Sequence, residues 1–96
     1  MAGMAQVIVR LYSALRAIAG ENETHLEADD VRQALDALVR KYGEEFKDSL
    51  FDAHNQIDLK FYRIFLNKDA LTPEDGLRKT LHDGDLIQIF PPVVGG

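Results

Sequence analysis

The stretch Leu86-Ile87-Gln88-Ile89-Phe90-Pro91-Pro92-Val93-Val94-Gly95-Gly96 ends the chain and decides how the rest is arranged. Its apolar first half, Leu86 to Phe90, predicts a strand. Pro91 and Pro92 end this strand because proline has no N–H for sheet pairing, and consecutive prolines favour an extended path. Gly95 and Gly96 lack a Cβ and can enter a channel too narrow for a side chain. We therefore predict a stiff stalk that carries a free α-carboxylate, with a merely frayed terminus as the alternative.

The composition limits the classes of protein to which the chain can belong. A chain of 96 residues has room for one core and no deep internal active site. Its 11 Lys and Arg residues are outnumbered by 16 Asp and Glu residues, and the net charge is -5. This excess of acidic residues argues against nucleic acid as a partner and leaves open a partner with a positively charged docking surface. With no cysteine, the chain has no disulfide, zinc-thiolate site or thiol nucleophile.

The targeting signals that the sequence could carry are also limited. Residues 1–6 have neither a basic start nor a long apolar run, so we expect no signal peptide. No stretch of the sequence approaches the length needed to span a bilayer. We therefore expect a soluble cytoplasmic protein that does not bind membranes.

The first part of the chain predicts two strands separated by a short helical turn. In residues 6–12, Val7, Val9 and Leu11 alternate with more polar positions, which predicts a half-buried strand. Residues 13–19 are good helix formers and end at Gly20, whereas residues 23–27 alternate again. We expect the second alternating segment to pair with the first strand as a hairpin.

An amphipathic helix is predicted over residues 31–42. Its apolar positions recur at helical spacing: Val31, Ala34, Leu35, Leu38, Val39 and Tyr42. Asp29 or Asp30 is expected to cap its start, and Gly43 to end it. A second short helix is plausible at residues 44–51, and the polar residues 52–58 are expected to form a loop.

The last part of the chain predicts two more strands. Residues 59–67 alternate as a strand, residues 71–81 are irregular, and residues 82–85 form a tight turn in which Gly84 has a positive φ. The first and last strands are expected to lie side by side and parallel in the middle of the sheet. We therefore predict an α+β fold, a mixed sheet wrapped over one main helix, in a single domain of residues 1–96. Residues 1–5 and 91–96 are expected to be flexible.

The order of elements and the end DGDLIQIFPPVVGG, residues 83–96, resemble the ubiquitin-like β-grasp sulfur carriers of the MoaD/ThiS type. The match is closest to the small, sulfur-carrying subunit of molybdopterin synthase. The segment LYSALRAIAG, residues 11–20, is similar to that family's aromatic-x-x-x-Arg-x-x-Ala/Val-Gly segment. Residues 46–59 and 71–81 are longer than in the shortest members, and Val94 is larger than the residue often found there. These departures leave open which carrier subfamily this is, including those that serve cysteine, thiamine or tRNA thiolation.

The resemblance implies chemistry at the C-terminal carboxylate. An α-carboxyl group has a pKa of about 3.5, and its ionised form is a poor electrophile that must first become an acyl-adenylate. The sequence has no GxxxxGK[ST] phosphate-binding loop, so the activation belongs to a partner. The resemblance implies an ATP-dependent, ubiquitin-activating-type adenylyltransferase, then a sulfur donor. The molybdopterin synthase large subunit then accepts the tail, and the sulfur passes to a pterin precursor.

The resemblance also assigns roles to residues of the tail and its root. Gly96 would carry the adenylate and the thiocarboxylate, and Gly95 would give clearance. The reach of the tail would be set by Pro91, Pro92, Val93 and Val94. Phe90 and Tyr12 match the family's docking positions, with a core or edge aromatic as the alternative for each. Arg63 and Phe65 are weaker candidates.

Other residues do not predict a site. His25, His54 and His82 show no ligand spacing, and Asp83 and Asp85 are more simply explained by a turn than by cation binding. We see no self-contained catalytic set and expect no metal or bound cofactor, so the chain is predicted to act as a co-substrate or non-catalytic subunit. Two alternatives remain: a protein modifier joined to lysines through Gly96, and an interaction domain with an inert tail.

Overall fold

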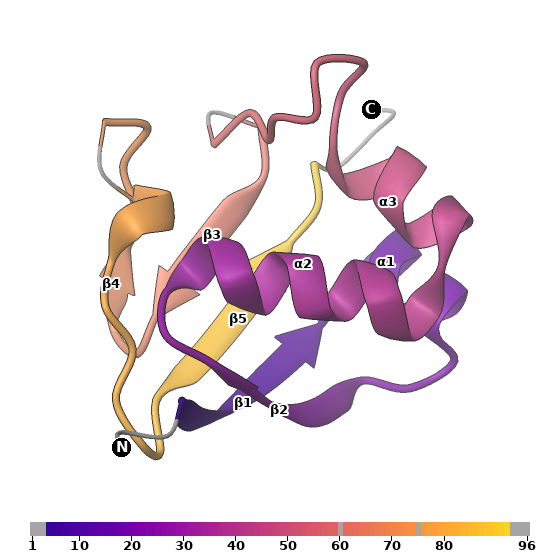
Figure 1. The fold of residues 1–96 in the computed structure, drawn as a ribbon. Helices are drawn as coiled ribbons and strands as arrows, with labels where there is room; N and C mark the ends of the chain where they lie inside the picture. The colour runs from indigo at the N-terminus through magenta and orange to yellow at the C-terminus, as the bar shows by residue number, and fades with distance from the viewer. Residues whose placement is uncertain (1–3, 60, 75, 93–96) are drawn as a thin grey trace.

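A computed structural model of the chain describes residues 4–59, 61–74 and 76–92. Five strands form one mixed sheet in the order β2-β1-β5-β3-β4, and α2 runs across one of its faces (Figure 1). The strands are β1 (Ala5–Leu11), β2 (Glu23–Ala28), β3 (Arg63–Leu66), β4 (Asp69–Ala70) and β5 (Leu86–Phe90). The helices are α1 (Ser13–Ala19), α2 (Val31–Tyr42) and α3 (Glu44–Leu50), with a 3₁₀ turn η1 (Gly76–Arg78).

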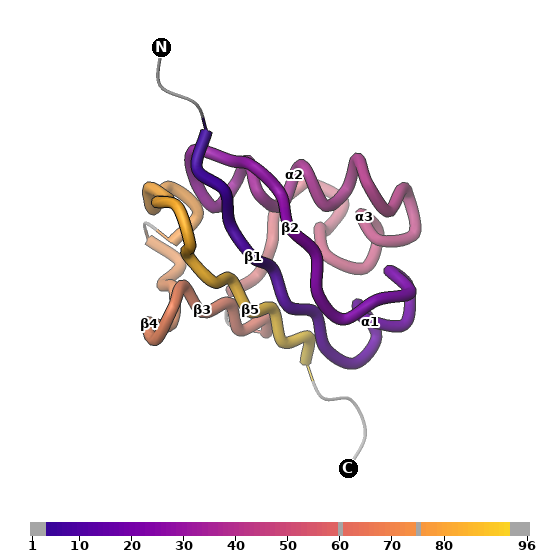
Figure 2. Tube along the Cα trace, turned by 90° about the horizontal axis from the view of Figure 1, so that it is seen from below, coloured from indigo at the N-terminus to yellow at the C-terminus, as the bar shows by residue number. Residues whose placement is uncertain are grey.

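The first and last strands lie parallel in the centre of the sheet, as predicted. Ile8 pairs with Leu86 at one end of this ladder and Leu11 with Ile89 at the other. β2 pairs with β1 in antiparallel orientation, and β3 pairs with β5 in the same way. Figure 2 shows β1 and β5 between β2 and β3, with α2 and α3 together on one side of the sheet. The C-terminal strand therefore has a neighbour on each side.

The core lies between the sheet and α2. Val7, Val9 and Leu11 of β1 are buried, as are Ile87 and Ile89 of β5. They face the apolar stripe of α2, whose buried residues are Val31, Ala34, Leu35 and Leu38. Each fully buried aliphatic side chain contributes about 1.5–3 kcal/mol of transfer free energy, so this layer supplies most of the driving force for the fold. The alternation in the central strands leaves their other side chains on the opposite face.

The two ends of α2 form as the sequence predicts. Of the two candidates, Asp30 is the N-cap of α2, because its Oδ1 accepts a hydrogen bond from the backbone N–H of Gln33 at 2.8 Å. Gln33 Oε1 in turn accepts from the backbone N–H of Asp29 at 2.8 Å, so the two donors are satisfied reciprocally. Gly43 ends the helix with a φ of 91°, a left-handed value that favours glycine.

The structure corrects the predicted strand at residues 59–67, because β3 covers only Arg63–Leu66. The backbone N–H groups of Phe61 and Tyr62 both donate to the carbonyl of Asp58, which makes a turn where a strand was expected. The Tyr62 hydroxyl donates to the carbonyl of Ser49 on α3, so this residue is held against the helices. The alternation of polar and apolar residues in this segment therefore reflects a packed turn.

The structure also contains secondary structure in segments that we expected to be irregular or flexible. Residues 69–70 form the short strand β4, and the irregular residues 71–81 contain η1 and a bridge between Asp30 and Thr80. Ala5, which we expected in a flexible start, pairs with Ala28 in the sheet. Residues 1–3 and 93–96 lie outside the described residues.

Candidate functional site

The root of the tail lies at the end of β5, in the middle of the sheet. On the β3 side, Phe90 pairs with Arg63. On the β1 side, the last pair is Leu11 with Ile89, so the backbone ladder stops one residue before Phe90. Pro91 and Pro92 follow and are half-buried. Because proline cannot donate to either neighbour, the backbone holds the root of the tail on one side only.

Three aromatic side chains, Tyr12, Phe65 and Phe90, surround this root; we call them the tail-root aromatic cluster. The rings of Tyr12 and Phe90 stack with centroids 4.3 Å apart and an interplanar angle of 11°. Phe65 meets Phe90 edge-on, at 5.8 Å and 89°. All three side chains are half-buried, and they lie on the sheet face opposite α2. Such a surface has the mixture of apolar area and accessibility that suits a docking site.

The structure thus brings together the two docking residues that the sequence predicted, Tyr12 and Phe90. Phe65, a weaker candidate, belongs to the same cluster. Arg63 is exposed and lies beside Phe90 in the strand pairing, outside the ring contacts. The predicted reacting residue Gly96, together with Gly95, Val94 and Val93, lies outside the described residues, so the roles of these four stay predictions.

Gln88 is a member of the site that sequence reasoning missed. Its Nε2 donates a hydrogen bond to the Tyr12 hydroxyl at 2.9 Å, in a partly buried position. The signal that would have found it is the period of two along β5, which places Gln88 on the same face as Phe90. Pairing of β1 with β5 then brings that face next to the residue that follows β1.

The backbone bends sharply where β1 ends beside the cluster. Tyr12 is extended, with φ −133° and ψ 156°, and Ser13 has a φ of 54°. A left-handed conformation is uncommon for a residue other than glycine and costs some free energy. The bend starts α1 immediately after Tyr12, while the Tyr12 ring stays against Phe90 on the outer face.

A cross-strand group of charged side chains joins β1 and β2 beside Gln88. Arg10 Nε lies 3.0 Å from Glu23 Oε1, and His25 Nε2 lies 3.5 Å from Glu23 Oε2. The hydrogen bonds from Arg10 and then from His25 lower the pKa of the Glu23 carboxyl below its ordinary value. This cross-strand group is exposed, and such surface pairs contribute little to stability. Next to the aromatic surface, the outer face therefore presents this paired group on the β1 side and the exposed Arg63 on the β3 side.

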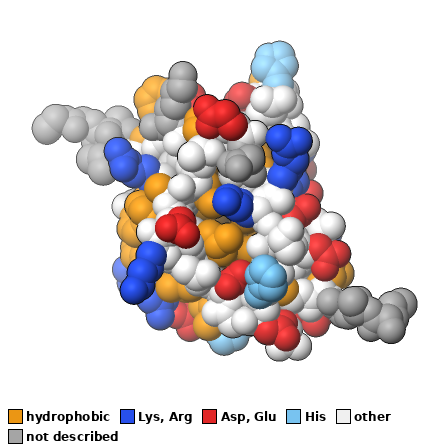
Figure 3. Space-filling view, turned by 90° about the vertical axis from the view of Figure 1, so that its left-hand side faces the viewer, with side chains coloured by type: hydrophobic (Ala, Val, Ile, Leu, Met, Phe, Trp, Pro, Cys, Tyr) orange, Lys and Arg blue, Asp and Glu red, His pale blue; other side chains and the backbone are white. Residues whose placement is uncertain are grey.

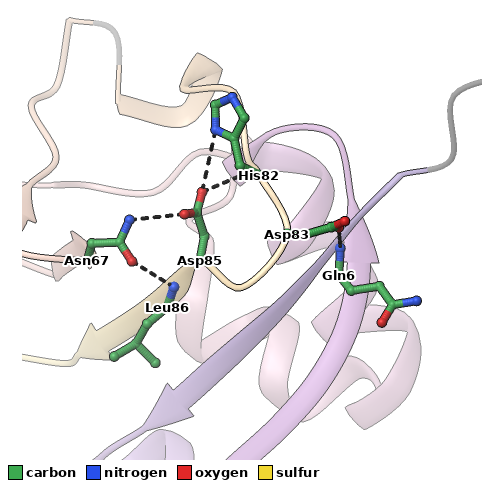
Figure 4. Close-up of polar contacts among 6 residues, drawn as sticks. All are labelled: Gln6, Asn67, His82, Asp83, Asp85 and Leu86. Atoms are coloured by element: carbon green, nitrogen blue, oxygen red, sulfur yellow. Dashed lines mark hydrogen bonds and ion pairs between the residues drawn. The ribbon is translucent and has the colours of Figure 1, made fainter.

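The Asp83-Gly84-Asp85 turn anchors the opposite end of β5 (Figure 4). Asp85 Oδ1 accepts from Asn67 Nδ2 at 3.1 Å, and Asp85 Oδ2 accepts from the backbone N–H of His82 at 2.8 Å. Asp83 Oδ1 accepts from the backbone N–H of Gln6 at 2.8 Å, and Gly84 has the predicted positive φ of 88°. Both carboxylates thus bind donors of the protein itself, which supports the turn that the sequence predicted.

Away from the cluster, the face at the β4 edge carries charges of both signs. On the face at the β4 edge, basic, acidic and histidine side chains are interspersed with hydrophobic ones, without a continuous basic patch among the side chains shown (Figure 3). Within residues 4–59, 61–74 and 76–92, no three His, Cys, Asp or Glu side chains are grouped as metal ligands would be. In the same residues, no helix combines the length and the apolar character needed to cross a membrane.

A mixed sheet over one main helix, with β1 and β5 parallel in its centre, defines a ubiquitin-like β-grasp protein. The sequence model of the ThiS family matches residues 9–96, and the chain belongs to this family. It is accordingly a ubiquitin-like sulfur carrier of the MoaD/ThiS type. The family resemblance and the fold class expected from the sequence are both confirmed.

Three similar proteins cover nearly the whole chain. The molybdopterin synthase sulfur carrier subunit of Chlamydomonas reinhardtii is 30% identical over 93 residues, which span 95% of this chain and 99% of that one. The solution structure of small archaeal modifier protein 1 from Methanosarcina acetivorans is 34% identical, with a TM-score of 0.83 and coverage of 97% and 98%. A complex of subunits 1 and 2 of the molybdopterin-converting factor from Helicobacter pylori contains a chain that is 26% identical, with a TM-score of 0.58 and coverage of 95% and 99%.

Proposed function

We propose that this chain carries sulfur for the synthesis of molybdopterin, with the carboxylate of Gly96 as the carrier group. One observation carries the proposal: in a chain of the ThiS family, the central strand β5 ends at Phe90 within an aromatic cluster, and the sequence continues from there as PPVVGG. The similarity to the Chlamydomonas reinhardtii sulfur carrier subunit supports molybdopterin as the pathway.

The chemistry takes place at Gly96 on successive partners. On an adenylyltransferase, a carboxylate oxygen of Gly96 attacks the α-phosphorus of ATP and pyrophosphate leaves. A sulfide equivalent from the sulfur donor then attacks the acyl carbon, AMP leaves, and a thiocarboxylate remains. The thiocarboxylate sulfur attacks a carbon of the pterin precursor and an oxygen leaving group departs. Water then hydrolyses the resulting acyl–sulfur bond, which leaves the sulfur on the pterin and restores the carboxylate. ATP is consumed on the partner, so this chain holds no cofactor and works in the cytoplasm, where ATP is supplied.

Among the described residues, those of the tail-root aromatic cluster bind the partner proteins during these steps. We place the large subunit of molybdopterin synthase over the tail-root aromatic cluster, so that the tail that follows Pro92 enters its active site. The Helicobacter pylori structure of subunits 1 and 2 in complex supports a partner of this kind. Aromatic side chains at the centre of an interface commonly supply much of its binding free energy.

Intact mass spectrometry tests the proposal directly. The chain is incubated with ATP, sulfide and a matching adenylyltransferase, and then with the synthase large subunit and pterin precursor. We expect a gain equal to the mass difference between sulfur and oxygen at the C-terminus, which disappears as molybdopterin forms. A chain extended by one alanine after Gly96 is the control and should not be loaded. Loading of the extended chain, or no loading of the unmodified chain, would contradict the proposal.

A protein modifier is the second candidate, and the likeness to the Methanosarcina acetivorans modifier protein favours it. The same adenylated carboxylate would be attacked by a lysine amine of a target protein, with AMP as the leaving group and an isopeptide bond as the product. A ladder of heavier adducts in a lysate, with no formation of molybdopterin in the reconstituted reaction, would favour this role over the first.

A further inference from the structure

The direction in which the tail leaves the sheet depends on a side-chain contact. The strand pairing holds Phe90 only through Arg63 on β3, because the ladder with β1 ends at Ile89. Pro91 donates no hydrogen bond that could extend the ladder. On the β1 side, the described contact of Phe90 is the stacked ring of Tyr12, 4.3 Å away. Whatever orients the Tyr12 ring therefore also orients the first residue of the tail.

We propose that Gln88 is a positioning residue for sulfur transfer, which acts through Tyr12 on Phe90 and so directs the tail towards its acceptor. This inference rests on the proposed sulfur-carrier function. Gln88 touches none of the reacting atoms; its Nε2 donates to the Tyr12 hydroxyl at 2.9 Å. The hydrogen bond reaches the far end of the phenol ring, where it best resists a rotation of the ring away from the stacked position.

The position of Gln88 in the sheet makes it a rigid anchor for this bond. It lies on the outer face of β5, paired with Arg10 on β1 and with Phe65 on β3. Tyr12, in contrast, follows the end of β1 and precedes Ser13, whose φ of 54° is a strained value. A side chain at such a bend needs a contact from regular structure to keep one orientation. The central strand supplies that contact through Gln88.

The alternative is that Gln88 is an ordinary polar residue on a half-exposed face. Each explanation predicts a different result in a double-mutant cycle of Gln88→Leu and Tyr12→Phe. Both substitutions keep the approximate shape of the side chain and remove one end of the same hydrogen bond. If the hydrogen bond between Gln88 and Tyr12 positions the tail, each single variant lowers the transfer rate by the same factor, and the double variant lowers it no further.

Transfer of sulfur from the loaded chain is measured in single turnovers at a saturating concentration of the synthase large subunit, with binding measured separately. We expect Gln88→Leu and Tyr12→Phe each to lower the transfer rate about fivefold, the equivalent of one neutral hydrogen bond, with little change in Kd. Gln88→Glu should restore transfer, because its carboxylate accepts from the Tyr12 hydroxyl. In the Tyr12→Phe background, Gln88→Glu should restore nothing.

Tyr42→Phe is the matched control, because it removes another tyrosine hydroxyl that binds a side chain, the Glu21 carboxylate, and Tyr42 lies on α2 rather than in the tail-root aromatic cluster. Its transfer rate should equal that of the unmodified chain. Thermal unfolding of all variants shows whether each is folded under the conditions of the transfer assay. A variant is compared only where it is fully folded, and Tyr12→Phe, which removes the other end of the same hydrogen bond, serves alone where Gln88→Leu is not.

A second readout needs no sulfur chemistry. The ¹⁵N order parameter of the Phe90 amide should fall in Gln88→Leu and in Tyr12→Phe, to the same value, and recover in Gln88→Glu. Unchanged order parameters and transfer rates, or losses that add in the double variant, would overturn the inference. If the unmodified chain is never loaded with sulfur, the proposed function fails, and the order parameters alone decide whether Gln88 orients the root of the tail.

Discussion

Phe90 and Ile89 are adjacent residues of β5 on opposite faces. Replacement of Ile89 by alanine should mainly lower stability, whereas replacement of Phe90 by alanine should mainly weaken partner binding. Ile89 is 0% exposed and packs in the core, so Ile89→Ala removes a buried aliphatic side chain and should lower the free energy of unfolding by roughly 3 kcal/mol. Phe90 is half-buried and has two ring contacts, so Phe90→Ala should cost roughly 1–2 kcal/mol of stability. The order should reverse for binding of the large subunit.

The binding effect follows from where the Phe90 ring lies. As the central aromatic of the docking surface, it should contribute at least about 2 kcal/mol, so that Phe90→Ala raises Kd roughly 30-fold. Ile89→Ala should change the Kd of the folded protein less than about threefold, because its side chain faces α2 rather than the partner.

Two assays on the same samples check this pair. Thermal unfolding should show a loss of roughly 12–24 °C for Ile89→Ala and a smaller loss for Phe90→Ala. Calorimetric titration with the large subunit should show the opposite ranking in Kd. Ile89→Val, which costs about 1 kcal/mol, replaces the alanine variant if that variant does not fold. The reasoning is refuted if Phe90→Ala destabilises more than Ile89→Ala and binds the partner normally, since Phe90 would then serve packing alone.

Four further predictions concern the tail, a helix cap and two titrating groups. Deleting Gly96 should abolish sulfur loading in the mass assay without moving the unfolding midpoint, because β5 ends at Phe90; a loaded truncated chain would remove Gly96 from the mechanism. Asp30→Ala should lower the free energy of unfolding by about 1 kcal/mol in urea, through loss of the cap of α2, and no loss would mean that the cap is redundant. Hydrogen bonds from Arg10 and then His25 lower the folded-state pKa of Glu23 below its ordinary value of 4.5, so its stabilisation is present above that pH and is lost as the pH falls. The stability of Glu23→Gln should therefore decline less on acidification, and an unchanged pH profile would contradict this. Burial, followed by the hydrogen bond to Glu21, raises the pKa of Tyr42 to about 12. Stability should then fall between about pH 10 and pH 12, less so in Tyr42→Phe. A phenolate absorbance difference between the unmodified chain and Tyr42→Phe with its midpoint near pH 10 would disprove the shift.

The sequence was most informative where the packing of a residue follows from its spacing. The period of two in residues 7–11 predicted which side chains of β1 are buried, because a strand sends alternate residues to opposite faces, and the apolar run of residues 86–90 predicted the strand β5. The period of α2 predicted its core face in the same way. The turn at Gly84 and the helix stop at Gly43 followed from glycine's access to positive φ.

The sequence was misleading where a contact distant in the chain overrides a local pattern. Residues 59–62 alternate like a strand, but the Tyr62 hydroxyl binds the Ser49 carbonyl, and two N–H groups share the Asp58 carbonyl. The two residues of β4 are too few for any periodic signal. Gln88 has no motif of its own, since its role requires a hydroxyl that approaches from the end of another strand.

The sequence by itself determined most elements of this protein and the buried faces of β1 and α2, and it contains the glycines on which the proposed chemistry depends. These properties are local, because they depend on backbone preferences and on the spacing of apolar residues. Only the tertiary structure decided that β3 is the other neighbour of β5, that Tyr12 and Phe65 meet at Phe90, and that Gln88 donates a hydrogen bond to Tyr12. The physical reason is that strand order and register bring distant residues within contact distance, and no local preference encodes which residues those are.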